Sequence, residues 1–480
     1  MKKILIFAVW ALCGVAALAG NKVPAADDLD GKVDVFVQSE LQKQHIPGAA
    51  VGVYRDGKMT RAQGYGLANV EWDATVTPDT IFQSGSVGKQ FTATAVMMLV
   101  EEGKVGLDDP IKKYFPDAPD AWNDIKVHNL LSHTSGLGEY ETGARTKVGG
   151  PFYMRLDYTE DELYKRITEM PMDFKTGEDW SYRNTNYVLL GILIHKVTGQ
   201  FYGDFLQERI FKPLGMSRTR IITEEDIIPR RAAGYRLVKG GLKNQEWVSP
   251  SLNSTADGAL YFTVEDLQKW DAALYAEKLL KKASLDRMWT VEKLNNGQPN
   301  KANYGFAWEI NNVNGHRVIE HGGAWQGFTT YIARYVDDRL TVVALTNLDS
   351  GHANPKKITT GVAALYNPAL KPLEQKPIED KEPQVTHLVK ELLRGIADGR
   401  AKPEQFTEEV RKRLFPDEMQ ELGPALKEFG ELKTLELMER TEEAERRNYR
   451  YRAKFGEMTL MVSVGLTKDD KIARLNFSEE

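Results

Sequence analysis

The sequence predicts an α+β protein in which helices flank an antiparallel sheet that carries an all-helical lobe, and a second, small α+β domain follows. Three observations predict this fold. Strand-like segments occur near both ends of residues 27–366, helices and loops fill most of the chain between them, and a proline-rich stretch precedes four further strand-like segments. We therefore expect the distant strands to pair in one sheet, with the intervening helices forming the lobe.

The chain begins with the features of a secretory signal peptide. Lys2 and Lys3 precede an apolar run that ends at Ala19, and Ala17 and Ala19 form a small-residue cleavage pattern. The run is shorter than a membrane-spanning helix, although an uncleaved anchor stays an alternative. We expect residues 1–19 to be removed on export, which leaves a secreted or periplasmic protein with no stable membrane insertion.

Cysteine content and charge exclude several classes of protein. The only cysteine, Cys13, lies within the signal peptide, so the mature chain has neither a thiol nucleophile nor a disulfide. The net charge is −5 over 480 residues, which is too weak a field to hold nucleic acid. The eight histidines lack ligand spacing, and we expect no metal and no cofactor.

The first domain is predicted to span residues 27–366. A helix over 29–44 precedes a hairpin that turns at Asp56-Gly57, because apolar residues first follow helical spacing and then alternate. Ser86 is expected to open an apolar helix that ends after Val100. The remaining expected elements are strands over 317–320, 329–335 and 341–346 and a closing helix over 356–366.

A linker and a second domain are predicted for the rest of the chain. Residues 367–384 contain four prolines interleaved with charges, which is typical of a semi-rigid linker. Residues 385–480 show three helical and then four strand-like segments, namely 385–396, 403–414, 417–429, 432–438, 448–454, 458–464 and 472–477. This layout resembles a small cystatin-like or nuclear-transport-factor-like module.

The first motif that could carry chemistry is Ser86-Val87-Gly88-Lys89. Ser86 is the only serine in the chain that is followed by a lysine three residues later. On a helix these two side chains share one face, and a lysine with apolar surroundings can take the proton that makes a serine hydroxyl nucleophilic. An ordinary N-cap serine beside an exposed lysine is the alternative.

Two further segments could join this pair. One is a polar cluster that contains Tyr182 and Asn184 and leads into an apolar helix, although it could simply cap that helix. The other is His321-Gly322-Gly323-Ala324, between two expected strands, where glycines permit a close approach of the backbone to a ligand or an ordinary bulge.

Together and in this order, the three segments resemble the serine hydrolases of the β-lactamase and penicillin-binding-protein superfamily. The likeness is to the branch of class C β-lactamases, D-amino-acid peptidases and related esterases, and it covers about residues 30–366. The flanking segments 80–85, 130–137 and 258–267 support it. The resemblance implies a β-lactamase/transpeptidase-like fold.

The resemblance also implies roles for individual residues. Ser86 would form the acyl-enzyme, with Lys89 as its proton partner. Tyr182 would complete the acid–base pair if adjacent cations, chiefly Lys89, lowered its pKa. Asn184 would orient Lys89 and a substrate amide, and the backbone N–H groups of Ser86 and Ala324 would stabilise an oxyanion.

The third motif departs from the β-lactamase pattern. Lys-Thr-Gly or Lys-Ser-Gly is usual there, whereas this chain has His321-Gly322-Gly323. We expect His321 to titrate near neutrality and to contact substrate together with Gly323, which favours a peptidase or esterase over an efficient β-lactamase. A packed strand-end histidine is the alternative interpretation.

The sequence therefore predicts an exported serine hydrolase that cleaves an amide or ester bond through an acyl-enzyme on Ser86. Its expected substrate is a small molecule or short peptide. The alternative is a catalytically silent relative that binds peptide or peptidoglycan.

Overall fold

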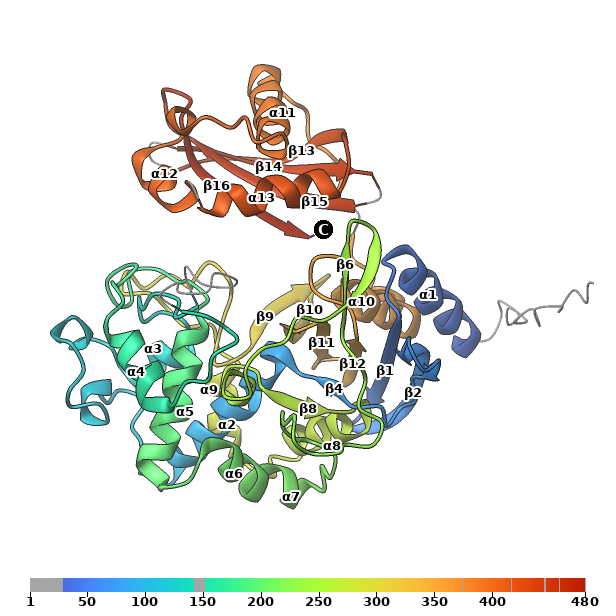
Figure 1. Ribbon diagram of the computed structural model, residues 1–480, viewed down its shortest axis with the longest axis vertical. Coiled ribbons are helices and arrows are strands. Elements are labelled where there is room, and N and C mark those ends of the chain that lie inside the picture. The colour runs from blue at the N-terminus through green and yellow to red at the C-terminus, as the bar shows by residue number, and fades with distance from the viewer. Residues whose placement is uncertain are drawn as a thin grey trace, which may run out of the picture.

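The computed structural model describes residues 29–141, 152–373, 375–415, 417–443, 446–456 and 458–479. The signal peptide expected at residues 1–19 lies outside these ranges. Every helix within them is too short or too polar to span a bilayer. Two parts are visible in Figure 1, which we call the body, up to Tyr366, and the C-terminal domain, from Pro383 onward.

A seven-stranded antiparallel sheet in the order β3-β2-β1-β12-β11-β10-β9 forms the centre of the body (Figure 1). Strand β1 pairs with β12, so that Ala49 lies opposite Thr346. This pairing confirms the expected sheet built from both ends of the body. Its strands are β1 (Gly48–Arg55), β2 (Lys58–Asn69), β3 (Ala74–Thr75), β9 (Glu309–Val313), β10 (His316–Trp325), β11 (Phe328–Tyr335) and β12 (Leu340–Thr346).

Helices α1 (Leu29–Lys43) and α10 (Pro355–Tyr366) cover one face of this sheet. Their close packing depends on Gly361, because a Cβ there would lie 2.1 Å from the ring of Phe36. Strands β11 and β12 are buried along their whole length, since helices lie on both faces. Most of their residues are therefore apolar, although Thr329, Thr330 and Arg334 interrupt the apolar sequence of β11.

The other face packs against α8 (Val264–Tyr275), α2 (Lys89–Glu101) and the helical lobe. The remaining helices of the body are α3 (Val127–Leu131), α4 (Glu160–Thr168), α5 (Asn184–Thr198), α6 (Tyr202–Leu206), α7 (Lys212–Leu214) and α9 (Lys282–Met288). Short turns of helix complete it: η1 (Gly85–Gly88), η2 (Ile111–Lys113), η3 (Asp120–Trp122), the π-helical η4 (Gln207–Phe211) and η5 (Leu252–Ser254). η6 (Pro368–Leu370) follows the body.

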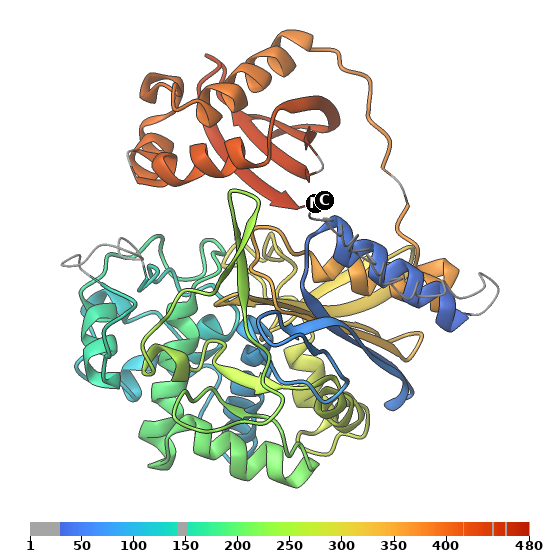
Figure 2. The same cartoon turned by 45° about the vertical axis from the view of Figure 1, so that its right-hand side comes forward.

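Several short strands were not foreseen from the sequence. Strands β4 (Phe82–Gln83), β8 (Leu260–Phe262) and β5 (Arg220–Ile221) form a small sheet, and β6 (Tyr235–Val238) pairs with β7 (Gly241–Asn244). Strands of two to four residues show no usable alternation. The β6–β7 hairpin reaches the C-terminal domain (Figure 2), where the Lys239 backbone N–H donates to Glu428 Oε1 at 2.7 Å.

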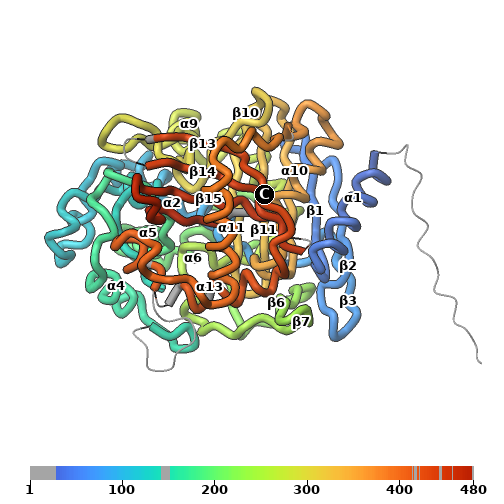
Figure 3. The backbone as a smooth tube through the Cα atoms, turned by 90° about the horizontal axis from the view of Figure 1, so that it is seen from above, coloured from blue at the N-terminus to red at the C-terminus, as the bar shows by residue number. Residues whose placement is uncertain are grey.

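The C-terminal domain has the three helices and four strands that the sequence predicts. Its elements are α11 (Pro383–Ala397), η7 (Pro403–Gln405), α12 (Glu408–Leu414), α13 (Asp417–Glu428), β13 (Leu432–Glu443), β14 (Arg446–Phe455), β15 (Met458–Leu466) and β16 (Ile472–Glu479). The strands form one antiparallel sheet, and a hydrophobic core of their own lies between sheet and helices. Figure 3 looks down onto this domain, with the body behind it.

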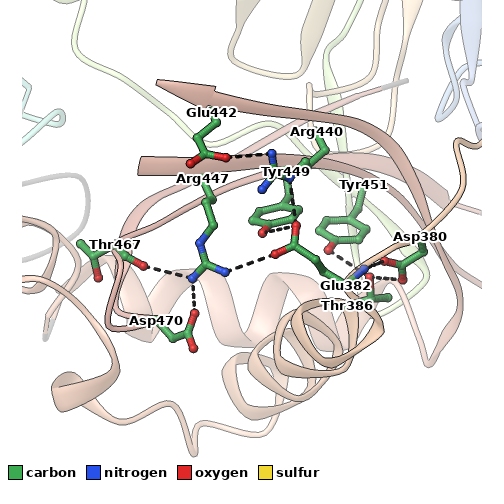
Figure 4. A network of polar contacts seen from close by, with 10 residues as sticks. All are labelled: Asp380, Glu382, Thr386, Arg440, Glu442, Arg447, Tyr449, Tyr451, Thr467 and Asp470. Atoms are coloured by element: carbon green, nitrogen blue, oxygen red, sulfur yellow. Dashed lines mark hydrogen bonds and ion pairs between the residues drawn. The ribbon is translucent and has the colours of Figure 1, made fainter. Parts of the chain in front are cut away.

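Glu382, just before α11, ties the start of the C-terminal domain to its sheet (Figure 4). Its carboxylate accepts hydrogen bonds from Arg440 Nε and from the Tyr449 hydroxyl, each at 2.9 Å. Nearby, Asp380 accepts from the Thr386 hydroxyl at 2.7 Å. The preceding chain runs along the side of the molecule (Figure 2) and is fixed at this end by charged hydrogen bonds.

A fully buried ion pair joins the main sheet to α8. Arg334 on β11 donates through Nε to Asp271 Oδ1 at 2.8 Å, and both side chains are 0% exposed. The Thr341 hydroxyl donates to the same oxygen, and the guanidinium lies 4.7 Å from the ring centroid of Tyr275. Asp271 thus depends on Arg334 to balance its buried charge.

We predict that Arg334→Met lowers the free energy of unfolding by about 3–5 kcal/mol, because it leaves the Asp271 carboxylate buried and unpaired. Urea denaturation measures this loss, and the double variant Arg334→Met/Asp271→Leu should recover much of it. As a control, Lys282→Met removes an exposed partner of Asp286 and should cost less than about 1 kcal/mol. Equal losses for the two single variants would contradict the prediction.

Candidate active site

Ser86 and Lys89 lie where β4 leads through η1 into α2. The Lys89 Nζ atom donates a hydrogen bond to Ser86 Oγ at 2.9 Å. Ser86 stands in the 3₁₀ turn that precedes the α-helix, rather than in the helix itself as expected. This tight turn includes Gly85 in the left-handed region at φ +49°, a conformation that favours glycine.

The Lys89 ammonium is held by three separate parts of the chain. Besides Ser86, Nζ donates to Asn184 Oδ1 at 2.8 Å and to the backbone carbonyl of Asp257. The residue is 0% exposed. Burial lowers the pKa of Lys89 to about 8, although the negative charges of Asp257, Glu139 and Glu141 oppose this shift. Lys89 can therefore accept a proton near neutral pH.

Tyr182 lies over this pair, with Lys89 Nζ 4.9 Å from its ring centroid. Burial raises the pKa of Tyr182 well above its usual value; the nearby Ser86 hydroxyl lowers it, but Asp257 adds to the rise. The condition set from the sequence, a pKa of Tyr182 lowered by Lys89, is not met, because desolvation dominates. The hydroxyl is buried without a regular hydrogen bond to any described residue, and it stays protonated at neutral pH.

Asn184 is placed by a carboxylate that the sequence did not reveal. Asn184 begins α5, and its backbone N–H donates to Glu139 Oε2 at 2.8 Å. Glu139 also accepts from the Thr185 hydroxyl at 3.3 Å, so it satisfies the first turn of the helix. The two partners lie 45 residues apart, and no local spacing could have paired them.

His321 is a buried and neutral group. Its Nε2 lies 2.8 Å from the Tyr304 hydroxyl, and its Nδ1 lies 2.6 Å from the carbonyl of Gly322. Burial lowers the pKa of His321 to about 4, with Lys89 contributing to the drop. The expectation that His321 titrates near neutrality is therefore wrong. His133 continues this aromatic group, with its ring centroid 4.3 Å from that of Tyr182.

Three glycines allow the backbone around Ser86 to approach two other segments. A Cβ on Gly85 would lie 2.3 Å from Ala324 N, and a Cβ on Gly323 would lie 2.2 Å from the carbonyl oxygen of Ser84 and 2.9 Å from Ser86 N. A Cβ on Gly258 would lie 2.7 Å from the Gly85 carbonyl. These close approaches place the backbone of Gly323 and Ala324 next to that of Gly85 and Ser86.

A cleft opens beside Ser86. Both apolar and polar residues line it, namely Gly85, Ser86, Asn184, Leu252, Thr255, Asp257, Gly258, Ala259, Ala324 and Trp325. Within the described ranges, no group of three or more metal-ligating side chains comes together. The arrangement offers a hydroxyl, a buried amine that acts as base, a protonated phenol and paired amides, which suits acyl transfer.

Comparison with known proteins agrees with this chemistry. Residues 33–366 match the family model described as Beta-lactamase. This match covers more than half of the chain, so the protein belongs to the Beta-lactamase family. It is a serine hydrolase of the β-lactamase and penicillin-binding-protein superfamily.

Curated relatives include penicillin-binding protein 4* of Bacillus subtilis, which is 29% identical over 64% of this chain and 69% of its own length. Protein flp of Staphylococcus aureus (strain MRSA252) is 26% identical over 69% of this chain, which spans 65% of that protein. The unguisins hydrolase ungD' of Aspergillus campestris is 29% identical over 76% of this chain and 71% of its own.

Solved structures confirm the β-lactamase/transpeptidase-like fold. An octameric penicillin-binding protein homologue from Pyrococcus abyssi superposes with a TM-score of 0.64 at 25% identity, over 94% of this chain and 95% of that one. A D-stereospecific amidohydrolase from Streptomyces superposes with a TM-score of 0.57 at 26% identity, over 70% of this chain and 98% of that one.

We predict that the rate at which a fluorophosphonate probe labels Ser86 rises with pH through about 8 and then levels. Only the neutral Lys89 amine can take the serine proton, so the rate should fall about tenfold per pH unit below that pKa. Intact-protein mass spectrometry over pH 5–10 measures this labelling rate. Lys89→Met should remove both the labelling and its pH dependence, whereas a plateau already present at pH 6 would contradict the prediction.

Proposed function

We propose that this protein is an exported serine hydrolase that cleaves an amide or ester bond through an acyl-enzyme on Ser86. The observation that carries the proposal is the 2.9 Å contact between Ser86 Oγ and the buried amine of Lys89. A lysine with a pKa of about 8 is matched to proton transfer near neutral pH. The substrate is a small molecule or a short peptide, because the cleft is small.

In the first half-reaction, neutral Lys89 takes the proton of Ser86 while Oγ forms a bond to the substrate carbonyl carbon. The resulting oxyanion accepts hydrogen bonds from the backbone N–H groups of Ser86 and Ala324. Collapse of this intermediate breaks the bond to the leaving amine or alcohol. The leaving group receives a proton from Tyr182, and the phenolate recovers that proton from the Lys89 ammonium.

In the second half-reaction, water attacks the ester carbonyl, and its proton passes to Lys89. The carbon–Oγ bond then breaks, the Lys89 ammonium returns a proton to Ser86 Oγ, and the carboxylic acid product leaves. Asn184 keeps the Lys89 amine aimed at Ser86 throughout, since its Oδ1 holds Nζ at 2.8 Å. His321 and Gly323 lie on β10, the strand that also carries Ala324, and His321 is fixed by Tyr304.

A peptidase, amidase or esterase role is better supported than that of an efficient β-lactamase. A β-lactam carries a carboxylate, and the residues that line the described cleft include no lysine or arginine to bind it. His321 cannot replace such a cation, because its pKa of about 4 leaves it neutral. The likeness to a D-stereospecific amidohydrolase supports amide hydrolysis.

We predict that Ser86→Ala abolishes turnover of a panel of p-nitrophenyl esters and amino-acid p-nitroanilides, since it removes the nucleophile. Loss of such a nucleophile costs on the order of 10⁶-fold in kcat. Steady-state absorbance assays and fluorophosphonate labelling measure the effect, and thermal unfolding checks the fold. Equal rates for the variant and the wild type would favour a silent peptide- or peptidoglycan-binding relative instead.

We predict that Gly323→Ala lowers kcat about 10²- to 10³-fold, because the new Cβ would push β10 away from Ser84 and part the two oxyanion amides. The matched control is Gly322→Ala, whose Cβ would come no nearer to a neighbour than 3.2 Å, at the Tyr331 ring, and should cost far less. Esterase assays of both variants test the difference. Similar losses in kcat would argue against the Ala324 amide as an oxyanion donor.

A further inference from the structure

Asp257 is a charged residue of the cleft for which the proposed mechanism has no use. Its backbone carbonyl accepts from Lys89, but its carboxylate makes no hydrogen bond or ion pair to any residue in the described ranges. The residue is 9% exposed, and it lines the cleft beside Ser86. An unpaired carboxylate that lines a cleft in an otherwise buried residue is placed to bind a positively charged group of a ligand.

The ionisable groups around Asp257 leave its own charge without a partner among the described residues. Asp257 and Glu139 both act on Lys89, which is largely neutral when it serves as the base. Arg183, which acts on Glu139, is engaged by Asp173 at 2.8 Å. The titratable groups that interact with Asp257 are Lys89, Glu139, Tyr140, Tyr182 and Tyr202. A bound cation would balance this charge.

The cleft also has apolar lining residues that are held in place. Trp325 donates through its indole N–H to Asn253 Oδ1 at 2.7 Å, and Asn253 is fully buried. Leu252 and Ala259 line the same cleft and are themselves 2% and 3% exposed. These residues can receive an apolar side chain while Asp257 binds a charged group.

We propose, on the basis of the function proposed above, that Asp257 binds the free α-ammonium group of the substrate, whose side chain packs on Trp325. The substrates are then amides, esters or short peptides that are cleaved next to an unblocked amino-terminal residue. The amino-terminal residue of the substrate is then the acyl group that becomes bound to Ser86. Substrates that present a carboxylate at this position are repelled by the same charge.

Three substrates that differ only in this charge test the proposal: phenylalanine p-nitroanilide with a free amine, its N-acetyl derivative and its N-succinyl derivative, each in both enantiomers. Wild type should prefer the free amine, and Asp257→Asn should lower kcat/KM for it by roughly 30-fold or more, whereas kcat/KM for the N-acetyl substrate on its high-pH plateau should change far less. Asp257→Glu should restore part of the preference. Asp204→Asn, an exposed neutralisation on α6, should leave all three rates unchanged.

The pH profile separates binding of the ammonium from the chemistry at Lys89. For the free amine, kcat/KM should be bell-shaped around pH 8, because the α-amine, with a pKa of about 8, must be protonated while Lys89 is neutral. For the N-acetyl substrate, kcat/KM should rise with pH through about pH 8 and then level off. Asp257→Asn should shift that rise to lower pH, since Asp257 raises the pKa of Lys89.

The outcomes distinguish the two proposals. In one outcome Ser86 is acylated, but wild type and Asp257→Asn each cleave the N-acetyl substrate as fast as the free amine. The assignment of Asp257 is then overturned, whereas the proposed hydrolase function stands. If neither substrates nor fluorophosphonate react at Ser86 in folded protein, both proposals fall.

Discussion

The site depends on one constraint, the burial of a single ammonium group. Lys89 has lost all contact with solvent, so its charged form is destabilised and must be held by oxygen atoms from elsewhere. Those oxygens come from Ser86, Asn184 and Asp257, which belong to η1, α5 and the loop before β8. The body is arranged so that these three segments meet, and a lysine that titrates near neutrality is the result.

The same segments are kept in place by backbone contacts that leave no room for side chains. Gly85, Gly258 and Gly323 let the chain around Ser86 lie between β10 and the loop before β8. Ser84 secures this position, since its hydroxyl donates to the Gly258 carbonyl and its own carbonyl accepts from Thr330. The turn that carries the nucleophile is thus held against rigid elements of the fold, which is how active sites keep their geometry.

Much of the fold could be predicted from the sequence because the long elements have strong periodicity. The helices α1 and α10, the hairpin of β1 and β2 and the seven main elements of the C-terminal domain lie close to their expected bounds. The short strands β4, β5 and β8 could not be predicted, since two or three residues carry no period. The domain ranges 27–366, 367–384 and 385–480 and the removal of residues 1–19 stay predictions.

For the site, the sequence determined which side chains are present and the order in which Ser86, Lys89, Tyr182, Asn184 and His321 occur. It could not determine their protonation, because burial depends on what the rest of the chain places around each group. Desolvation raises the pKa of Tyr182 and lowers that of His321, and both changes oppose what local reasoning predicted. Glu139, Tyr304 and Asp257 join the site only through tertiary contacts, since each acts on a partner far away along the chain.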